Sequence, residues 1–278
     1  MQTDERTRPG PEPAEQAPVL TSPAPEPAGH ALSGPGHDAT GPLTALPPRH
    51  PGVPGPAGSA SVRGLRTVAA DATAVRGTGA GLAAAVADGI GDTAAAARAA
   101  RIAADLAAAV APQVGSFHAV LAAGEAVRAE PDAADTVLVV AAGLPDGGWS
   151  VSWVGDCRAL LVTERATTLL THDHTVAEYS RERGEIPGAR WENVVTTTVR
   201  TATAEQPGHV RGPAGAGTLV LLSDGVHRTL DAETIGFLVR RGPGPAAAAR
   251  ALVDAALAAG SRDNATATVV PLPPQWRP

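Results

Sequence analysis

Residues 82–89 read Leu-Ala-Ala-Ala-Val-Ala-Asp-Gly, an apolar run of strand length that ends on a carboxylate and a glycine. Residues 219–225, Leu-Val-Leu-Leu-Ser-Asp-Gly, repeat this arrangement. A third aspartate, Asp263, comes before Asn264 and the strand-like residues 265–270. A carboxylate at a strand end projects beyond the sheet edge, and a glycine after it lets backbone and ligand approach closely. These carboxylates are therefore candidate ligand groups.

Three carboxylates from distant segments can converge into a cluster of oxygen ligands. Because like charges packed together repel one another, such a cluster implies a divalent cation. Oxygen-only ligands suit Mg²⁺ or Mn²⁺ better than Zn²⁺. Asp-Gly is also an ordinary turn dipeptide, so each pair taken singly stays open to that interpretation.

The composition excludes several classes of protein. All 22 basic residues are arginine, which excludes mechanisms that need a lysine, such as Schiff-base chemistry and the Walker A phosphate loop. The net charge of −6 argues against a nucleic-acid partner, which needs a basic face. The single cysteine, Cys157, cannot form an internal disulfide, and the position six residues after it is Thr163, so the Cys-x5-Arg loop of cysteine phosphatases is absent.

The domain organisation follows from the prolines. Of the 26 prolines, 14 lie in the first 60 residues, which offer few large apolar side chains. Such a segment cannot form a packed core, so residues 1–60 are predicted to be a disordered tail. Residues 61–271 are predicted to form one domain, and residues 272–278 a short C-terminal tail. The N-terminus lacks a signal-peptide core and no unbroken apolar run reaches about 18 residues, so we expect a soluble, cytoplasmic protein without a membrane partner.

Within residues 61–271 the patterning predicts an α+β fold. Runs rich in Val, Leu and Trp predict strands, and alanine-rich segments predict helices. The elements occur in blocks, which favours antiparallel sheets with helices beside them over a doubly wound parallel sheet. The predicted strands are 81–87, 136–142, 149–154, 159–162, 218–222 and 265–270, and the predicted helices are 92–110, 116–128, 231–240 and 246–259.

Five short motifs follow one another along the chain. They are Val-Ala-Asp-Gly-Ile-Gly-Asp at 86–92, Trp-Val-Gly-Asp-Cys-Arg-Ala at 153–159, Thr-His-Asp-His-Thr at 171–175, Leu-Leu-Ser-Asp-Gly-Val at 221–226 and Ser-Arg-Asp-Asn-Ala-Thr at 261–266. From about Arg63 to Val270, this series resembles the metal-dependent serine/threonine protein phosphatases of the protein phosphatase 2C type, the PPM family, in their bacterial form. The resemblance implies a four-layer α-β-β-α sandwich, in which pairs of antiparallel helices flank two central antiparallel sheets.

The resemblance also implies a binuclear site for Mn²⁺ or Mg²⁺. By motif position, Asp88 bridges the two ions, the Gly89 carbonyl ligates one of them, and Asp224 and Asp263 complete the set of direct ligands. A water that bridges the ions then attacks the phosphorus of phosphoserine or phosphothreonine. The implied substrates are phosphorylated proteins, made by a bacterial Ser/Thr kinase.

Three further residues receive roles from the resemblance. Arg66 is expected beside the substrate phosphate, where its planar fork can bind two oxygens; an exposed arginine on an edge strand is the alternative. Asp71 is expected to support the metal ligands through water. Asp132 is the candidate ligand for a third ion, and an ordinary loop acid is the alternative there.

The sequence departs from the family pattern just before Asp71. Ala69 and Ala70 replace an Asn-Glu pair, and loss of an outer acceptor can lower metal affinity or activity about 10–100-fold. This leaves open a second function, that of a catalytically weak or inactive relative that binds phosphoproteins or a regulatory partner. Asp92 replaces a usual glycine and is predicted to cap the following helix. His174 is predicted to form a structural hydrogen bond.

Overall fold

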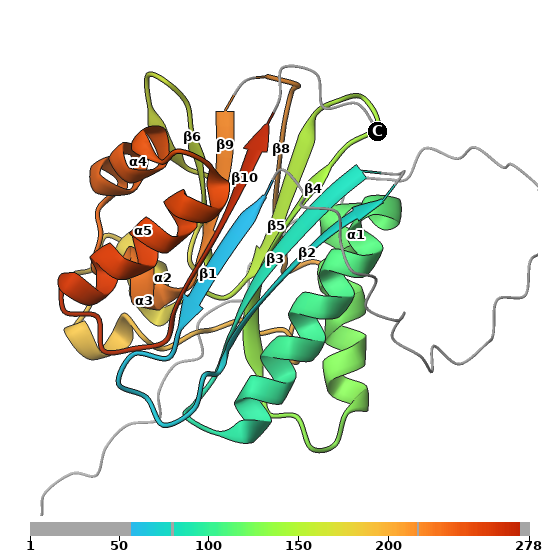
Figure 1. The fold of residues 1–278 in the computed structure, drawn as a ribbon. Coiled ribbons are helices and arrows are strands. Elements are labelled where there is room, and N and C mark those ends of the chain that lie inside the picture. The colour runs from blue at the N-terminus through green and yellow to red at the C-terminus, as the bar shows by residue number, and fades with distance from the viewer. Residues whose placement is uncertain (1–56, 79–80, 216, 273–278) are drawn as a thin grey trace, which may run out of the picture. The chain divides into compact units, whose positions relative to one another are not determined.

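The computed structural model describes residues 57–78, 81–215 and 217–272 (Figure 1). Most of the predicted tail 1–60, and residues 273–278 of the predicted C-terminal tail, lie outside the described residues. The first strand, β1, spans Gly58–Val62 and takes in the last residues of the predicted N-terminal tail. The last strand, β10, spans Ala265–Leu272 and ends one residue beyond the predicted domain boundary.

The described strands form two five-stranded sheets in which every pair is antiparallel. One sheet has the order β2-β3-β4-β5-β8 and the other has the order β1-β10-β9-β6-β7. The predicted α+β class with two antiparallel sheets is therefore confirmed. The remaining strands are β2 (Asp71–Thr78), β3 (Gly81–Gly89), β4 (Thr136–Gly143), β5 (Trp149–Val154), β6 (Arg158–Val162), β7 (Thr167–Leu169), β8 (Gly208–Gly212) and β9 (Gly217–Leu222).

The longer helices pack on the sheets (Figure 1). Helix α1 (Ala94–Ala129) packs against β3 and β4, whereas α5 (Pro245–Ala258) packs against β1 and β10, with α4 (Ala232–Arg241) beside it. The patterning predicted two helices in place of α1, and the structure joins them across Gly115, whose φ of 80° interrupts the helical path. The short helices are α2 (Val176–Glu182), a 3₁₀ helix (Ala189–Trp191) and α3 (Asp224–His227).

Strand β3 shows how the apolar run at 82–87 becomes a central strand. Ala85 and its odd-numbered neighbours pack against α1, whereas Val86 and its even-numbered neighbours pack between the two sheets. Both faces are buried, which is why nearly every position in the run is apolar. Because side chains alternate along a strand, Asp88 continues the face that lies between the sheets.

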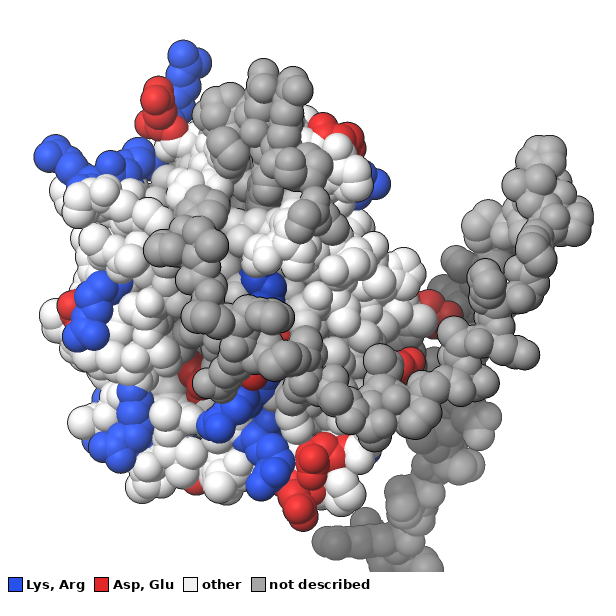
Figure 2. All heavy atoms as spheres, turned by 45° about the vertical axis from the view of Figure 1, so that its right-hand side comes forward, with Lys and Arg blue, Asp and Glu red and all other residues white. Residues whose placement is uncertain are grey.

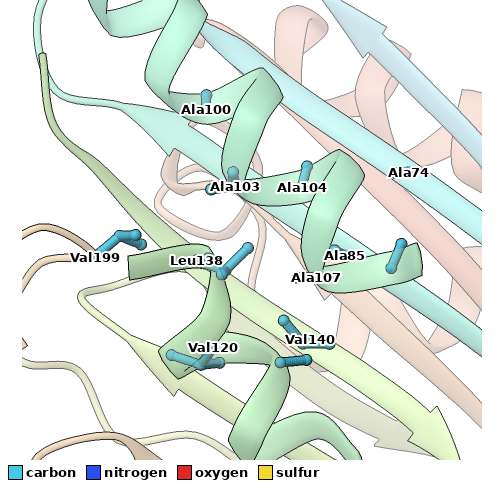
Figure 3. Close-up of a cluster of buried hydrophobic side chains, with 14 of the residues drawn as sticks. Ala74, Ala85, Ala100, Ala103, Ala104, Ala107, Val120, Leu138, Val140 and Val199 are labelled. Atoms are coloured by element: carbon cyan, nitrogen blue, oxygen red, sulfur yellow. The ribbon is translucent and has the colours of Figure 1, made fainter. Parts of the chain in front are cut away.

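Helix α1 approaches its sheet through alanine. Figure 3 shows Ala103 and Ala107 of α1 in the cluster that also holds Leu138 and Val140 of β4. Small side chains allow the helix to lie close to the sheet. By length and composition alone, α1 is also apolar enough to cross a membrane, although polar residues interrupt its apolar runs. Most of its alanines are buried, as in the core helix of a globular domain.

The charged surface consists of arginines and acidic residues. On the face that Figure 2 shows, the two kinds are interspersed around broad uncharged areas. Ion pairs occur on the helices, such as Arg250 with Asp254 on α5 at 2.9 Å. Exposed pairs of this kind contribute about 0–1 kcal/mol each.

Candidate active site

Two aspartates meet across neighbouring strands at one end of the gap between the sheets. In the register of β2 and β3, Asp71 lies opposite Asp88. Residues opposite each other in an antiparallel pair have Cβ atoms about 4.5–5.5 Å apart on one face of the sheet. The other sheet brings Asp224, at the start of α3 after β9, and Asp263, just before β10. Because β9 and β10 are paired neighbours, their carboxylates come from adjacent strand ends.

A cavity of about 160 Å³ opens at this end of the sheets. Five of the residues predicted for the site line it: Arg66, Asp88, Gly89, Asp224 and Asp263. Asp71 stands next to it, with its Oδ2 accepting a 2.7 Å hydrogen bond from the Ser223 hydroxyl. The structure therefore brings together residues that are far apart in the sequence.

Backbone packing explains why glycine follows two of these aspartates. A Cβ on Gly89 would lie 2.5 Å from the carbonyl oxygen of Ala96, in the first turn of α1. A Cβ on Gly225 would lie 2.0 Å from the carbonyl oxygen of Asn264. The first Asp-Gly pair ends β3 and the second begins α3, so neither is the turn that the dipeptide alone allowed.

The carboxylates of this site are buried and repel one another. Burial raises the pKa of Asp71 to about 6. Burial, and next the charge of Asp156, raises the pKa of Asp224 to about 7, although Arg228 acts in the opposite direction. Burial and the charge of Asp71 raise the pKa of Asp88 well above its usual range. Within the described chain, the Oδ1 atoms of Asp71 and Asp224 are buried and have no hydrogen-bond partner.

Arg66 reaches the cavity from the loop between β1 and β2. Its Nη2 donates to Oδ2 of Asp263 over 2.6 Å, and 43% of its side chain is exposed. The residue therefore lies in a loop at the rim of the site, and the alternative of an arginine on an edge strand does not hold.

Asp92 fastens the loop that carries Arg66. Its two carboxylate oxygens accept hydrogen bonds from the N–H groups of Thr67 (2.9 Å) and Val68 (2.7 Å) and from the Thr67 hydroxyl (2.9 Å). The prediction that Asp92 caps the helix is wrong, because Thr93 is the N-cap of α1. The carboxylate of Asp92 is already committed to the loop.

Asn264 fastens the same loop from the other sheet. Its Oδ1 accepts from the N–H of Ala70 (2.6 Å), and its Nδ2 donates to the carbonyl groups of Arg63 (2.7 Å) and Val68 (3.0 Å). Ala70 belongs to the pair that departs from the family pattern, and its backbone is nevertheless held in place.

Arg228 is a site residue that the motifs did not indicate. It follows α3 and lines the cavity. Its Nε lies 3.2 Å from Oδ2 of Asp224, and its Nη2 lies 2.7 Å from Oδ2 of Asp156. The sequence does contain a signal for the first contact, because an arginine four residues after an aspartate has the spacing at which helical side chains meet.

Comparisons with known proteins agree with this geometry. No protein-family model matches the chain. The PPM Ser-Thr phosphatase MsPP from Mycobacterium smegmatis superposes with a TM-score of 0.67 and 27% identity, covering 78% of this chain and 98% of that one. The resemblance to the PPM phosphatases is confirmed. The class of enzyme indicated by the motifs, a serine/threonine phosphatase, is also the class of these structural relatives.

Other PPM relatives extend the comparison. The serine/threonine phosphatase Stp1 from Staphylococcus aureus has a TM-score of 0.69 at 19% identity, over 78% of this chain and 94% of that one. The catalytic domain of PstP, solved with two manganese ions, has a TM-score of 0.63 at 23% identity, over 77% and 96%. These two likenesses show the fold. A probable protein phosphatase 2C from Oryza sativa subsp. japonica is 32% identical over 160 residues, which is 50% of this chain and 39% of that protein's length.

The carboxylates fit the divalent cation that a PPM site requires. A hard cation relieves the repulsion between buried carboxylates and supplies a partner for their orphaned oxygens. The candidate donors are carboxylates and the Gly89 carbonyl, a set that suits Mn²⁺ or Mg²⁺. In the part of the chain that the structure describes, no three acidic, histidine or cysteine side chains already form a ligand cluster. Arg66 and Arg228 instead contact Asp263 and Asp224.

Three other residues that the sequence analysis singled out do not line the cavity. Asp132, the candidate for a third ion, is exposed and does not line it, and its N–H contacts the Glu130 carboxylate at 3.4 Å. The Nδ1 of His174 accepts from the N–H of Gly155 over 3.3 Å, which is a structural contact. Cys157 is buried, and burial raises the pKa of its thiol, so it is not a reactive thiolate.

Proposed function

We propose that this chain is a Mn²⁺- or Mg²⁺-dependent phosphatase that hydrolyses phosphoserine and phosphothreonine in proteins on a binuclear centre. The observation that carries the proposal is the single cavity that gathers Arg66, Asp88, Asp224 and Asp263 from four distant segments. The two manganese ions in the PstP structure support the choice and number of ions. Because Asp132 lies away from the cavity lining, the proposal includes two ions and no third.

The acidic residues would hold the ions. The direct ligands would be Asp88, the Gly89 carbonyl, Asp224 and Asp263, with Asp71 supporting them from the neighbouring strand. Bound Mn²⁺ or Mg²⁺ would supply Lewis acidity to the phosphoryl oxygens and to the attacking water.

The protein side chains would bind the phosphate and leave the attack to water. Arg66 would donate to the phosphate from the rim of the cavity, where a guanidinium can bind two oxygens. Ser223 is not an available nucleophile, because its hydroxyl donates to Asp71 and accepts from the N–H of Thr266 over 2.9 Å. Cys157 is buried.

The finer assignments of fold and context belong to the same proposal. Helix α1 packs on one sheet, and α4 and α5 pack on the other (Figure 1). This arrangement supports a four-layer α-β-β-α sandwich. The bacterial Ser/Thr phosphatases among the relatives support phosphoproteins as the substrates. The proposal also includes a bacterial Ser/Thr kinase as the enzyme that makes these phosphoproteins, and the cytoplasm as the site of reaction.

A catalytically weak regulator is the less favoured function. Its support is the Ala69-Ala70 replacement. However, Asp92 and Asn264 hold the loop at that point, and the four candidate ligand groups are all retained. A decayed site is expected to lose its ligands first.

The test is hydrolysis of p-nitrophenyl phosphate and of a phosphothreonine peptide with Mn²⁺. The site variant is Asp224→Asn, and the matched control is Asp254→Asn on the exposed side of α5. We expect turnover by the wild-type and control proteins, and a loss of about 100-fold or more in the site variant. If the protein does not hydrolyse either substrate at saturating Mn²⁺ but still binds the phosphopeptide, the proposal fails and the function is that of a catalytically weak regulator.

A further inference from the structure

Arg228 contacts three separate parts of the site at once. Its Nε lies 3.2 Å from Oδ2 of Asp224. Its Nη2 donates to Oδ2 of Asp156 over 2.7 Å and to the backbone carbonyl of Glu192 over 2.9 Å. Only 28% of the Arg228 side chain and 8% of the Asp156 side chain are exposed. Water and salt therefore screen these contacts less than they screen a surface ion pair.

The contact with Asp224 distinguishes its two carboxylate oxygens. Oδ2 forms an ion pair with Arg228, whereas Oδ1 is buried and has no hydrogen-bond partner among the described residues. A carboxylate that is held through one oxygen keeps the other in a fixed position. Under the proposed function, Oδ1 is then the oxygen that Asp224 offers to a divalent ion, and Arg228 orients it.

The contact with Glu192 reaches a different wall of the cavity. Asn193 and Val195 follow Glu192 and line the same cavity as Asp224. Arg181 also contacts Glu192, through its carboxylate, but Arg181 belongs to the neighbouring helix α2. Arg228 therefore joins this wall of the cavity to the C-terminal end of α3.

We propose that Arg228 is a positioning residue that fixes the free oxygen of Asp224 and the 192–195 wall in one arrangement. The role toward the ion rests on the proposed function. The guanidinium is planar and presents its N–H groups in a rigid fork, so its three partners keep fixed relative positions. A lysine carries the same charge on a single nitrogen and cannot hold the same three groups in this geometry.

The test compares Arg228→Gln and Arg228→Lys with a matched control, Arg250→Gln. The control breaks another arginine–aspartate pair with i,i+4 spacing, on α5 and outside the cavity lining. Two quantities are measured in each protein: Mn²⁺ affinity by calorimetry, and hydrogen exchange of the amides of residues 192–196. We expect Arg228→Gln to bind Mn²⁺ about 10-fold more weakly and to exchange these amides faster. Arg228→Lys is expected to fall between Arg228→Gln and wild type, and Arg250→Gln to match wild type.

The sign of the Mn²⁺ result decides the proposal. Removing a positive charge by itself favours cation binding, so an unchanged or tighter Mn²⁺ affinity in folded Arg228→Gln overturns the positioning role. If that variant does not fold, Arg228→Lys decides, because it keeps the charge and loses the fork; wild-type affinity there also overturns the role. Wild-type protein that binds no Mn²⁺ overturns the proposed function. Hydrogen exchange still tests the contact with the wall in that case, and unchanged exchange at 192–196 overturns it.

Discussion

Asp71 and Asp88 lie directly opposite each other across the antiparallel strands β2 and β3. Like charges at opposed positions destabilise a sheet, and burial increases the effect. One oxygen of Asp71 is held by Ser223 and the other has no hydrogen-bond partner within the described chain. Under the proposed function, the opposed pair therefore supports ion binding at the expense of stability.

The first prediction concerns Asp88→Asn, which keeps the shape of the side chain and removes its charge. In EDTA, we expect this variant to be more stable than wild type by about 1 kcal/mol, as is common when a functional site is neutralised. We expect it to lose Mn²⁺-dependent hydrolysis. Thermal unfolding in EDTA and a phosphopeptide assay measure the two effects. A variant that is inactive and also less stable in EDTA would show that Asp88 has a structural role instead.

A second prediction concerns the loop that carries Arg66. Asp92→Ala removes three hydrogen bonds to Thr67 and Val68. Because misplacement of a positioning group can cost up to about 100-fold in rate, we expect kcat/KM for a phosphopeptide to fall by roughly 10- to 100-fold. Mn²⁺ affinity should stay close to wild type, since Asp92 is not a proposed ligand. Asp254→Ala is the control, and an equal loss of Mn²⁺ affinity and activity in Asp92→Ala would contradict the assignment.

The third prediction concerns close packing behind Asp224. In Gly225→Ala the new Cβ would lie 2.0 Å from the carbonyl oxygen of Asn264, so backbone has to move. We expect a loss of stability of about 2 kcal/mol or more, measured by urea unfolding. Gly77→Ala is the control, because its Cβ would meet only the Leu82 side chain at 3.7 Å. Equal stability of the two variants would contradict the close approach of Gly225 to the Asn264 carbonyl.

The fourth prediction concerns pH and the buried His227. Its Nε2 donates to the carbonyl of Asp156 over 2.9 Å, because a carbonyl can only accept, and its Nδ1 has no partner among the described residues. Burial, and next the charge of Arg158, lowers the pKa of His227 to about 3. In the unfolded chain this histidine has an ordinary pKa of about 6.5. As the pH falls below about 6.5, the unfolded chain therefore binds a proton at His227 that the folded chain does not bind.

The contribution of neutral His227 to the free energy of unfolding is therefore fully present above about pH 6.5, and it is lost as the pH falls toward about 3. Between about pH 7 and pH 5, the free energy of unfolding of wild type should fall by about 2 kcal/mol more than that of His227→Gln, which keeps a donor but does not titrate. Urea unfolding at the two pH values measures this difference. His118→Gln, at an exposed histidine, should retain the wild-type pH dependence. Parallel curves for wild type and His227→Gln would exclude the effect.

The strands that the sequence predicted are the interior ones. β3, β4, β5, β6, β9 and β10 all lie between two neighbours, whereas β1, β2, β7 and β8, which the patterning missed, are the four edge strands. An interior strand is buried on both faces and reads as an unbroken apolar run. An edge strand such as β8, Gly-His-Val-Arg-Gly, is partly exposed and carries no such run. The missed strands therefore share one physical cause.

The sequence by itself determined that the candidate ligands Asp88 and Asp224 lie at the ends of strands. Asp88 and Asp224 follow apolar runs of strand length, and the alternation of side chains along a strand is a local property that a sequence displays. Only the tertiary structure decided which oxygens are paired and which are free. Arg66 lies 197 positions from Asp263, and Arg228, at the C-terminal end of α3, reaches Asp156 and Glu192 in distant segments. Such contacts depend on how distant segments pack, which no short-range pattern encodes.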